Sequence, residues 1–353
     1  MLPANYLLEM LLWLGELVLA SFLLSYGSEH LSARYGGRFV GRTVMSVATT
    51  LPEIAIVVYA AAEGSYGIAL GAGLGSNLLM MTLGLAIMLV IATTRLSKAP
   101  LKGIDVSRFR LDKIFLVVTS ISSAALFVNG YDYVDGFIFS GLFLAYLILA
   151  YREMRIERRQ ALQLVASTDS DRPGPIYAGG QGLGGKDSGN SVLKAALVFV
   201  VGTIGIFFGA GPFIGSLGGL ALDSGISVVV LAVIISPIAG EMPEKLSMMI
   251  LARKGEAGAS IAVANVLGSK ILNNTLLLAV AVFGAMYHGG FFAQIEATPI
   301  LGYQMALVTS VTIIALIPMF KRKISLGVGI FLAALYGVSL LVQFQLPHDL
   351  GGS

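Results

Sequence analysis

Two segments of the sequence place a proline-glutamate pair inside a long apolar run. The first is Thr49-Thr50-Leu51-Pro52-Glu53, and the second is Gly240-Glu241-Met242-Pro243-Glu244. A glycine follows the last Glu after 11 residues in both copies, and a Gly-Ser dipeptide follows it after 22 residues in the first and 24 in the second. A carboxylate in hydrocarbon costs free energy, so such residues mark functional sites by default. Their recurrence predicts an internal repeat with a binding site where the two copies meet.

Both segments offer oxygen ligands. A proline within a helix frees the carbonyl four residues earlier, which would be that of Ala48 in the first copy and Ala239 in the second. Beside them are two carboxylates, Glu53 and Glu244. The hydroxyl and amide candidates are Thr49, Thr50, Ser76, Asn77, Asn265, Ser269 and Asn273. Hard cations such as Ca²⁺ and Na⁺ prefer all-oxygen sites. Two facing carboxylates would neutralise one Ca²⁺ and could instead hold two protons or monovalent cations, which is the simplest basis for exchange.

Two charged residues in the second copy have two interpretations. Glu241 could form a structural ion pair with Lys270 or Lys245, or it could take part in transport together with Lys270. Lys245 could reach an interface by extending its side chain, whereas Lys270 is placed near the middle of its run. Glu53 and Glu244 could also be structural, but the doubled Pro-Glu context favours a role in binding.

The composition indicates a helical membrane protein. Of the 353 residues, 56% are hydrophobic and 12% are charged, against about 25% charged in a soluble domain. The chain has no cysteine and three histidines, and these (His30, His288 and His348) fall near the ends of apolar runs or near the C-terminus. This argues against disulfides, thiolate or histidine metal centres, and an intramembrane enzyme. We expect no cofactor and no nucleic-acid partner.

Ten apolar runs are long enough to cross a bilayer, which takes roughly 17–25 residues. They are 6–26, 43–62, 66–93, 114–129, 134–151, 192–212, 225–252, 257–284, 301–318 and 325–345. All Lys and Arg residues except Lys245 and Lys270 fall in alternate connections: 27–42, 94–113, 152–194, 253–254 and 321–323. Cytoplasmic loops carry an excess of Lys and Arg. The pattern therefore predicts a multi-pass protein of the cell membrane with both termini outside the cytoplasm.

The connection at 152–191 divides the chain into two five-span halves, 1–151 and 192–353. Its stretch from Thr168 to Asn190 is rich in Gly, Ser, Pro and Asp, which is typical of a flexible linker. Because five is odd, the second half must enter the membrane with the opposite orientation. The predicted fold class is an all-α integral membrane protein of ten transmembrane helices in two inverted five-helix repeats. Glycines 71, 73, 75 and 268 predict a span that packs closely or unwinds near the site.

The repeated segments, about 43–93 and 225–284, resemble the alpha repeats of the calcium/cation antiporter superfamily, which includes sodium/calcium and proton/calcium exchangers. These repeats carry Gly-Ser/Thr-Ser-Leu-Pro-Glu and then Gly-Asn-x-x-Gly-Ser-Asn. The corresponding segments here are 48–53 with 71–77, and 239–244 with 264–270. The resemblance implies that Glu53 and Glu244 are the main cation ligands and that spans 6–26 and 192–212 act as gates. It further implies ligands at Thr49, Thr50, Ser76, Ser269 and Asn273.

This chain departs from the family's pattern at several ligand positions. Ala72 and Met80 replace side-chain oxygens in the first copy, Gly240 and Glu241 replace hydroxyls in the second, and Lys270 replaces an amide. Several Na⁺ ions would be harder to coordinate, and the Lys270 ammonium could occupy space that a coupling ion uses elsewhere. The sequence favours a secondary antiporter that exports Ca²⁺ in exchange for H⁺ by alternating access. Na⁺/Ca²⁺ exchange stays open, as does a passive cation channel.

Overall fold

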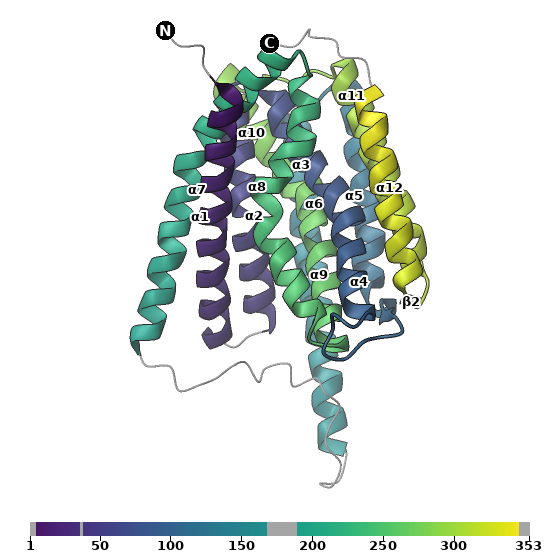
Figure 1. The fold of residues 1–353 in the computed structure, drawn as a ribbon. Helices are drawn as coiled ribbons and strands as arrows, with labels where there is room; N and C mark the ends of the chain where they lie inside the picture. Colours follow the sequence, from purple (N-terminus) through teal and green to yellow (C-terminus); the bar gives the residue numbers. More distant parts are fainter. Residues whose placement is uncertain (1–4, 36–37, 168–188, 346–353) are drawn as a thin grey trace.

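The chain folds into a bundle of long helices (Figure 1). The computed structural model describes residues 5–35, 38–167 and 189–345, with the side chains at 28–35, 38–48, 154, 157–167, 189–192 and 243 left out. The elements of the first part are α1 (Tyr6–Tyr35), α2 (Arg38–Ala62), α3 (Tyr66–Leu79), η1 (Met80–Gly84), α4 (Leu85–Thr93), β1 (Ile104–Asp105), η2 (Ser107–Phe109), α5 (Arg110–Leu126), η3 (Phe127–Asn129) and α6 (Tyr133–Ser167). Those of the second are α7 (Gly189–Ser224), α8 (Val228–Ala252), α9 (Glu256–Leu272), η4 (Asn273–Leu277), α10 (Leu278–Gly289), α11 (Pro299–Leu316), η5 (Ile317–Phe320), β2 (Lys323–Ile324) and α12 (Leu326–Gln345).

The predicted apolar runs coincide with helix to within a few residues at most ends. In the described part of the chain, eight helices are long and apolar enough to cross a membrane. In the helices that carry the Pro-Glu pairs, α2 and α8, the described residues include the apolar stretches Thr49–Ala62 and Val228–Met242, which are bounded by the omitted side chains at 48 and 243. The protein is therefore a helical membrane protein with multiple apolar helices.

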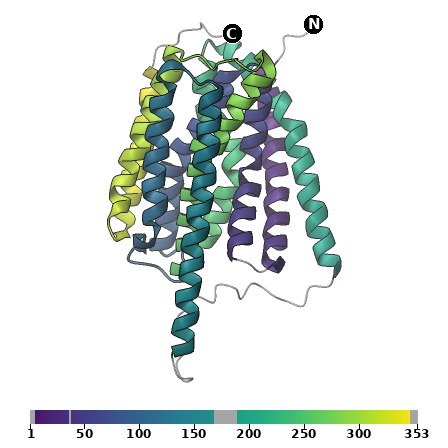
Figure 2. The same cartoon turned by 180° about the vertical axis from the view of Figure 1, so that it is seen from behind.

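Three helices extend well beyond the predicted runs. Helix α1 continues from the predicted end at 26 to Tyr35. Helix α6 continues from the predicted end at 151 to Ser167 and protrudes from the bundle (Figure 2). Residues 152–167 are rich in Glu, Arg, Gln, Ala and Leu, which are strong helix formers. Helix α7 continues past 212 to Ser224, with Pro212 inside it. Most of the predicted linker, residues 168–188, lies outside the described residues.

The basic connections gather at one end of the bundle. Strand β1 pairs with β2, so that Asp105 lies opposite Lys323. The backbone N–H of Lys98 donates to the carbonyl of Arg253 at 3.2 Å, which joins the 94–113 connection to the turn after α8. At the other end, Tyr131 forms an isolated bridge with Ile295. Helix α1 begins and α12 ends at this second end (Figures 1 and 2).

Close packing of α3 against α8 forms the centre of the bundle. Helix α3 is almost wholly buried, and its small residues let the backbone of α8 approach. A Cβ at Gly71 would lie 2.8 Å from the Cβ of Ala232, and a Cβ at Gly75 would overlap the carbonyl of Val233. Pro237 removes the helical partner of that carbonyl. The expected close packing is confirmed, and α3 stays helical where unwinding was the alternative.

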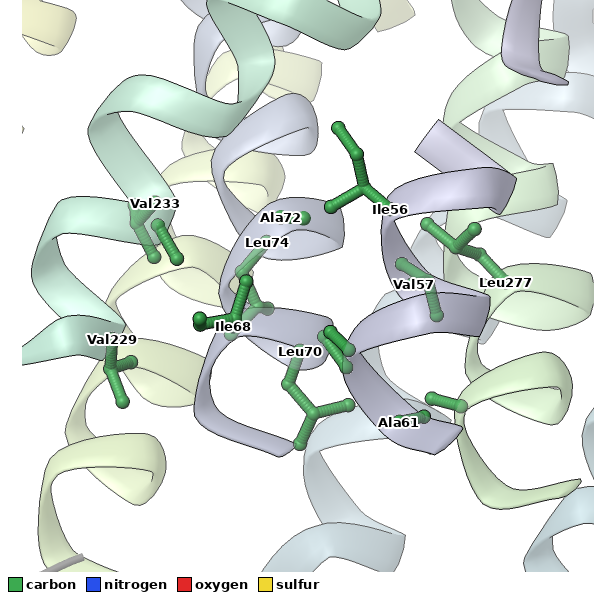
Figure 3. Close-up of a cluster of buried hydrophobic side chains, with 14 of the residues drawn as sticks. Ile56, Val57, Ala61, Ile68, Leu70, Ala72, Leu74, Val229, Val233 and Leu277 are labelled. Atoms are coloured by element: carbon green, nitrogen blue, oxygen red, sulfur yellow. The ribbon is translucent and has the colours of Figure 1, made fainter. Parts of the chain in front are cut away.

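Apolar side chains seal one side of this centre (Figure 3). Ile56 and Val57 of α2, Leu70 and Leu74 of α3, and Val233 of α8 all belong to one buried cluster. The cluster adjoins the turns that carry the polar residues, because Ile56 is three residues after Glu53 and Leu74 is two residues before Ser76. Burial among these side chains keeps water from one side of the polar centre.

The contact at Gly75 predicts a large effect of a small substitution. Gly75→Ala should destabilise the protein by about 1–3 kcal/mol, because the added methyl meets backbone that cannot turn aside. Gly302→Ala in α11 is the matched control, since a Cβ there meets nothing within 4 Å. The measurement is thermal unfolding of the purified protein in detergent. Equal unfolding temperatures for the two variants would contradict the packing described here.

Candidate cation site

The two Pro-Glu segments meet in the interior of the bundle. Helices α2 and α8 contact each other, and Pro52 lies within a continuous α2. The side chains of Glu53 and Glu244 are 2% and 1% exposed, and those of Glu241 and Lys270 are both 0% exposed. Glu244 interacts electrostatically with Glu53, Glu241 and Lys270. The structure therefore brings the sequence-predicted carboxylates into one buried cluster.

Equivalent π-turns follow the Gly-Ser dipeptides of both copies. Element η1 begins four residues after Ser76, and η4 begins four residues after Ser269. Such turns are rare in proteins overall, and those that occur are often found at functional sites. In each turn a threonine hydroxyl donates to the carbonyl four residues earlier: Thr82 to Leu78, and Thr275 to Ile271. The widened turn of η4 places the amide of Asn273 against the ionised groups.

An ion pair between Glu241 and Lys270 lies at the centre of the cluster. Lys270 Nζ contacts Glu241 Oε1, and it donates to Ser76 Oγ at 2.5 Å. The Ser76 hydroxyl in turn donates to Glu241 Oε1. Of the two lysines considered as the partner of Glu241, the structure pairs Lys270. Lys245 is half-buried and donates to the carbonyl of Pro237 at 3.1 Å.

The Asn273 amide completes the surroundings of the ammonium. Its outer atom is 2.6 Å from Ser76 Oγ in either amide orientation. With its oxygen toward the cluster, Asn273 accepts a hydrogen bond from Lys270 Nζ at 3.2 Å, and its nitrogen donates to the Ser269 carbonyl at 3.2 Å. The single Ser76 proton then has two neighbouring acceptors, Asn273 and Glu241. In the reverse orientation the Asn273 NH₂ group would face the ammonium, which can only donate hydrogen bonds. Lys270 therefore has three oxygen acceptors for its three N–H groups.

Glu244 has neutral hydrogen-bond donors of its own. Ser269 Oγ donates to Glu244 Oε1 at 2.8 Å, and Asn265 Nδ2 donates to the same oxygen at 3.2 Å. Both donors lie on α9, one turn apart, so they share a helix face. Hydrogen bonds from neutral donors stabilise a buried carboxylate without cancelling its charge. The second copy thus supplies an anionic site with two polar side chains.

Glu53 shares its polar neighbours with the ion pair: it interacts with Ser76 and Glu241, and the Asn273 amide lies 3.4 Å from Glu53 Oε1. The Glu53 side chain lies against Gly240 of α8, where a Cβ would come within 2.5 Å of Glu53 Cγ. Its buried Oε2 has no hydrogen-bond partner among the described residues. Ala72, which corresponds to Asn265 of the second copy, is a buried apolar residue in the cluster of Figure 3. The carboxylate of Glu53 is therefore available to a cation or a proton.

The remaining predicted ligands belong to α2 and α8. Thr49 and Thr50 are 1% and 0% exposed, and each takes part in at least one polar or electrostatic interaction. Ala239 is fully buried in α8, and Ala48 lies in α2, with its side chain outside the described residues. The proposed ligation by the carbonyls of Ala48 and Ala239 stays a prediction.

A chain of polar side chains extends from the site to α5. Asn77 Nδ2 donates to Asn274 Oδ1 at 2.5 Å, and Asn274 Nδ2 donates to Ser120 Oγ at 2.8 Å. Of these three residues, only Asn77 was predicted from the sequence as a ligand. Asn274 could have been predicted, because a second amide directly follows Asn273 within an apolar run. Ser120 could not, because a single serine in a membrane helix does not indicate a polar site.

The charges of the cluster fit a small cation. In the part of the chain that the structure describes, no group of three or more His, Cys, Asp and Glu side chains is arranged to hold a metal ion. Glu241 is neutralised by Lys270, so two of the three buried glutamates remain to balance other charges. Two carboxylates with hydroxyl and amide oxygens nearby suit one hard divalent cation or two monovalent ones.

Removing one partner of the central ion pair should lower the stability of the protein more than removing both. Glu241→Gln should destabilise the protein by about 3–5 kcal/mol, because it leaves a buried ammonium without its counter-charge. Adding Lys270→Met should recover most of that loss, since the ammonium that lost its partner is removed as well. Urea or thermal unfolding of both variants in detergent measures the difference. A double variant no more stable than Glu241→Gln alone would contradict the pairing.

Comparisons with known proteins match nearly the whole chain. The model of the family described as "Sodium/calcium exchanger protein" matches residues 6–152 and 194–345. An uncharacterized membrane protein of Methanocaldococcus jannaschii, MJ0091, is 24% identical over 340 residues, which cover 94% of this chain and 98% of that protein.

Solved structures of two ion exchangers share the fold. The H⁺/Ca²⁺ exchanger CAX matches with a TM-score of 0.72 at 21% identity, over 97% of this chain and 82% of that chain. The sodium-calcium exchanger NCX_Mj matches with a TM-score of 0.58 at 24% identity, over 95% of this chain and 98% of that chain. These relatives are ion exchangers, not enzymes. Because the family model matches most of the sequence, the chain belongs to the sodium/calcium exchanger family, within the calcium/cation antiporter superfamily.

Proposed function

We propose that the protein exports Ca²⁺ in exchange for monovalent cations by alternating access, with Glu53 and Glu244 as the ligands that the two ions share in turn. The observation that carries the proposal is the charge of the buried cluster. Once Lys270 has neutralised Glu241, two carboxylates remain, and these match one Ca²⁺ or two protons. An exchanger needs the same groups to bind either cargo but not both together.

H⁺ is the counter-ion that this site favours. A proton needs only the carboxylates, whereas each Na⁺ needs several oxygen ligands of its own. Around Glu53 the neutral oxygens are already engaged, because Ser76 and Asn273 are bonded to the ion pair, and Ala72 lies where the second copy has Asn265. The donors Ser269 and Asn265 around Glu244 favour the second candidate, Na⁺/Ca²⁺ exchange, because their oxygens could also coordinate Na⁺. The solved relatives include exchangers of both kinds, and their likeness supports the fold alone.

The proposed topology has ten spans, with the basic end of the bundle in the cytoplasm and both termini outside. The eight apolar helices, together with α2 and α8, would supply the ten spans. The family model matches in two parts, 6–152 and 194–345, and π-turns occur at equivalent positions of both. These observations support two inverted halves, 1–151 and 192–353, joined through residues 152–191.

Labelling of single cysteines tests this topology. The chain has no cysteine of its own, so each variant carries one reactive thiol. Phe292→Cys, at the end with few basic residues, should react with an impermeant maleimide added to intact cells. Lys102→Cys, in the 94–113 connection, should react only after the cells are permeabilised. Labelling of both thiols from the same side would rule out the proposed arrangement.

Flux measurements test the function and the counter-ion together. In proteoliposomes, ⁴⁵Ca²⁺ should accumulate against its gradient when a pH gradient is imposed, and not when only a Na⁺ gradient is imposed. Accumulation driven by Na⁺ alone would assign Na⁺/Ca²⁺ exchange. Flux that only runs downhill would assign a channel, and no flux under either gradient would reject Ca²⁺ as the cargo.

Substitution of buried and exposed glutamates tests whether Ca²⁺ flux depends on Glu53 and Glu244. Glu53→Gln and Glu244→Gln should each reduce exchange at least tenfold, because a neutral amide cannot balance Ca²⁺ or release a proton. Glu63→Gln and Glu256→Gln are the controls, since both side chains are exposed near helix ends. These controls should retain wild-type flux. Equal losses in all four variants would separate the flux from the buried cluster.

A further inference from the structure

The ammonium of Lys270 is held as a bound cation would be held. It is fully buried and far from either end of its apolar run, and three oxygens accept its hydrogen bonds, from Glu241, Ser76 and Asn273. One acceptor is a carboxylate, one a hydroxyl and one an amide. These are the ligand types that the sequence offers to a transported ion, and an ammonium is a compact point charge of the same sign.

The ion pair also replaces a neutral pair of the first copy. Glu241 corresponds to Thr50, because each lies three residues before the Glu of its copy, and Lys270 corresponds to Asn77, because each directly follows the Gly-Ser dipeptide. The first copy therefore has a hydroxyl and an amide where the second has a carboxylate and an ammonium. The two substitutions cancel in charge, so the cluster gains a resident cation without changing the net charge offered to Ca²⁺.

The ion pair lies close enough to Glu53 and Glu244, the proposed cation ligands, to interact with both. Lys270 interacts electrostatically with Glu53 and with Glu244, and Ser76 and Asn273, both expected as cargo ligands, are bonded to it. A pair needed only to join two helices would not have to engage those ligands. An ion bound among the same oxygens would compete directly with the ammonium for them.

We propose that Lys270 is a tethered cation that permanently takes the place of one transported monovalent ion, so that it sets how many such ions move for each Ca²⁺. The proposal rests on the exchange function proposed above. Ser76, Asn273 and Glu241 then serve Lys270 in every state of the cycle, while Glu53 and Glu244 alternate between cargoes.

The decisive variant converts the second copy to the residues of the first. Glu241→Thr with Lys270→Asn removes both charges together and leaves hydroxyl and amide oxygens in their place. Reversal potentials of ⁴⁵Ca²⁺ flux in proteoliposomes, measured in Na⁺ and in choline, give the number of Na⁺ ions coupled to each Ca²⁺. That number should rise by one in the double variant. Lys245→Asn, which removes a nearby ammonium bonded to a backbone carbonyl, is the control and should keep the wild-type number.

A second measurement does not depend on Ca²⁺ flux. Lys270→Asn alone leaves Glu241 buried without a counter-charge, and Na⁺ should then bind among the same oxygens. The Na⁺-induced rise in unfolding temperature, relative to choline at equal ionic strength, should therefore be several degrees larger in this variant than in the wild type. An equal rise would show that no small cation fits there.

The outcomes separate the two proposals. Wild-type protein that moves no Ca²⁺ under either gradient overturns the exchange function, while the Na⁺-dependent unfolding still tests the cation position. Wild-type exchange with an unchanged coupling number in the double variant overturns the role of Lys270. Failure of both Lys270 variants to fold in either salt also overturns it, because it assigns the ion pair to the stability of the fold alone.

Discussion

The cost of burying charge governs the centre of this protein. Three glutamates and one lysine lie within the bundle with almost no exposure, and each would be strongly destabilising if it stood alone. Lys270 and Glu241 contact each other, so their two charges neutralise one another. Glu53 and Glu244 are left with a combined charge that the protein's own buried side chains do not balance. A cation or protons would therefore accompany the two carboxylates, and the proposed exchange function uses this requirement.

The surrounding packing follows from the same constraint. Helices α2, α3, α8 and α9 must approach closely for so few polar groups to satisfy one another, and glycines at the contacts make this possible. Gly240 leaves room for the side chain of Glu53, and Gly75 leaves room for the carbonyl that Pro237 releases on α8. Apolar residues such as Ile56 and Leu74 close the remaining space.

The sequence predicted the elements and the identity of the central residues better than their pairing. Apolar runs and the positions of Lys and Arg located the helices, and the doubled Pro-Glu segments located Glu53 and Glu244, because charge in hydrocarbon is a strong signal. Pairing was harder, since both Lys245 and Lys270 were within reach of Glu241 by spacing alone. Asn274 and Ser120 were missed because their partners come from helices distant in the sequence. The extension of α6 was missed because helix formers outside the membrane carry no hydropathy signal.

The matching π-turns bear on the history of the chain. A π-turn accommodates more residues than an α-helical turn, so forming one inside an existing helix alters the register of everything that follows. In this protein the turns η1 and η4 begin at the same distance from their Gly-Ser dipeptides, and each has its threonine at the same place. If the halves descend from one duplicated ancestor, the turn was already present in it. The difference between the charged pair of the second half and the neutral pair of the first would then have arisen after the duplication, on a backbone whose shape was already settled.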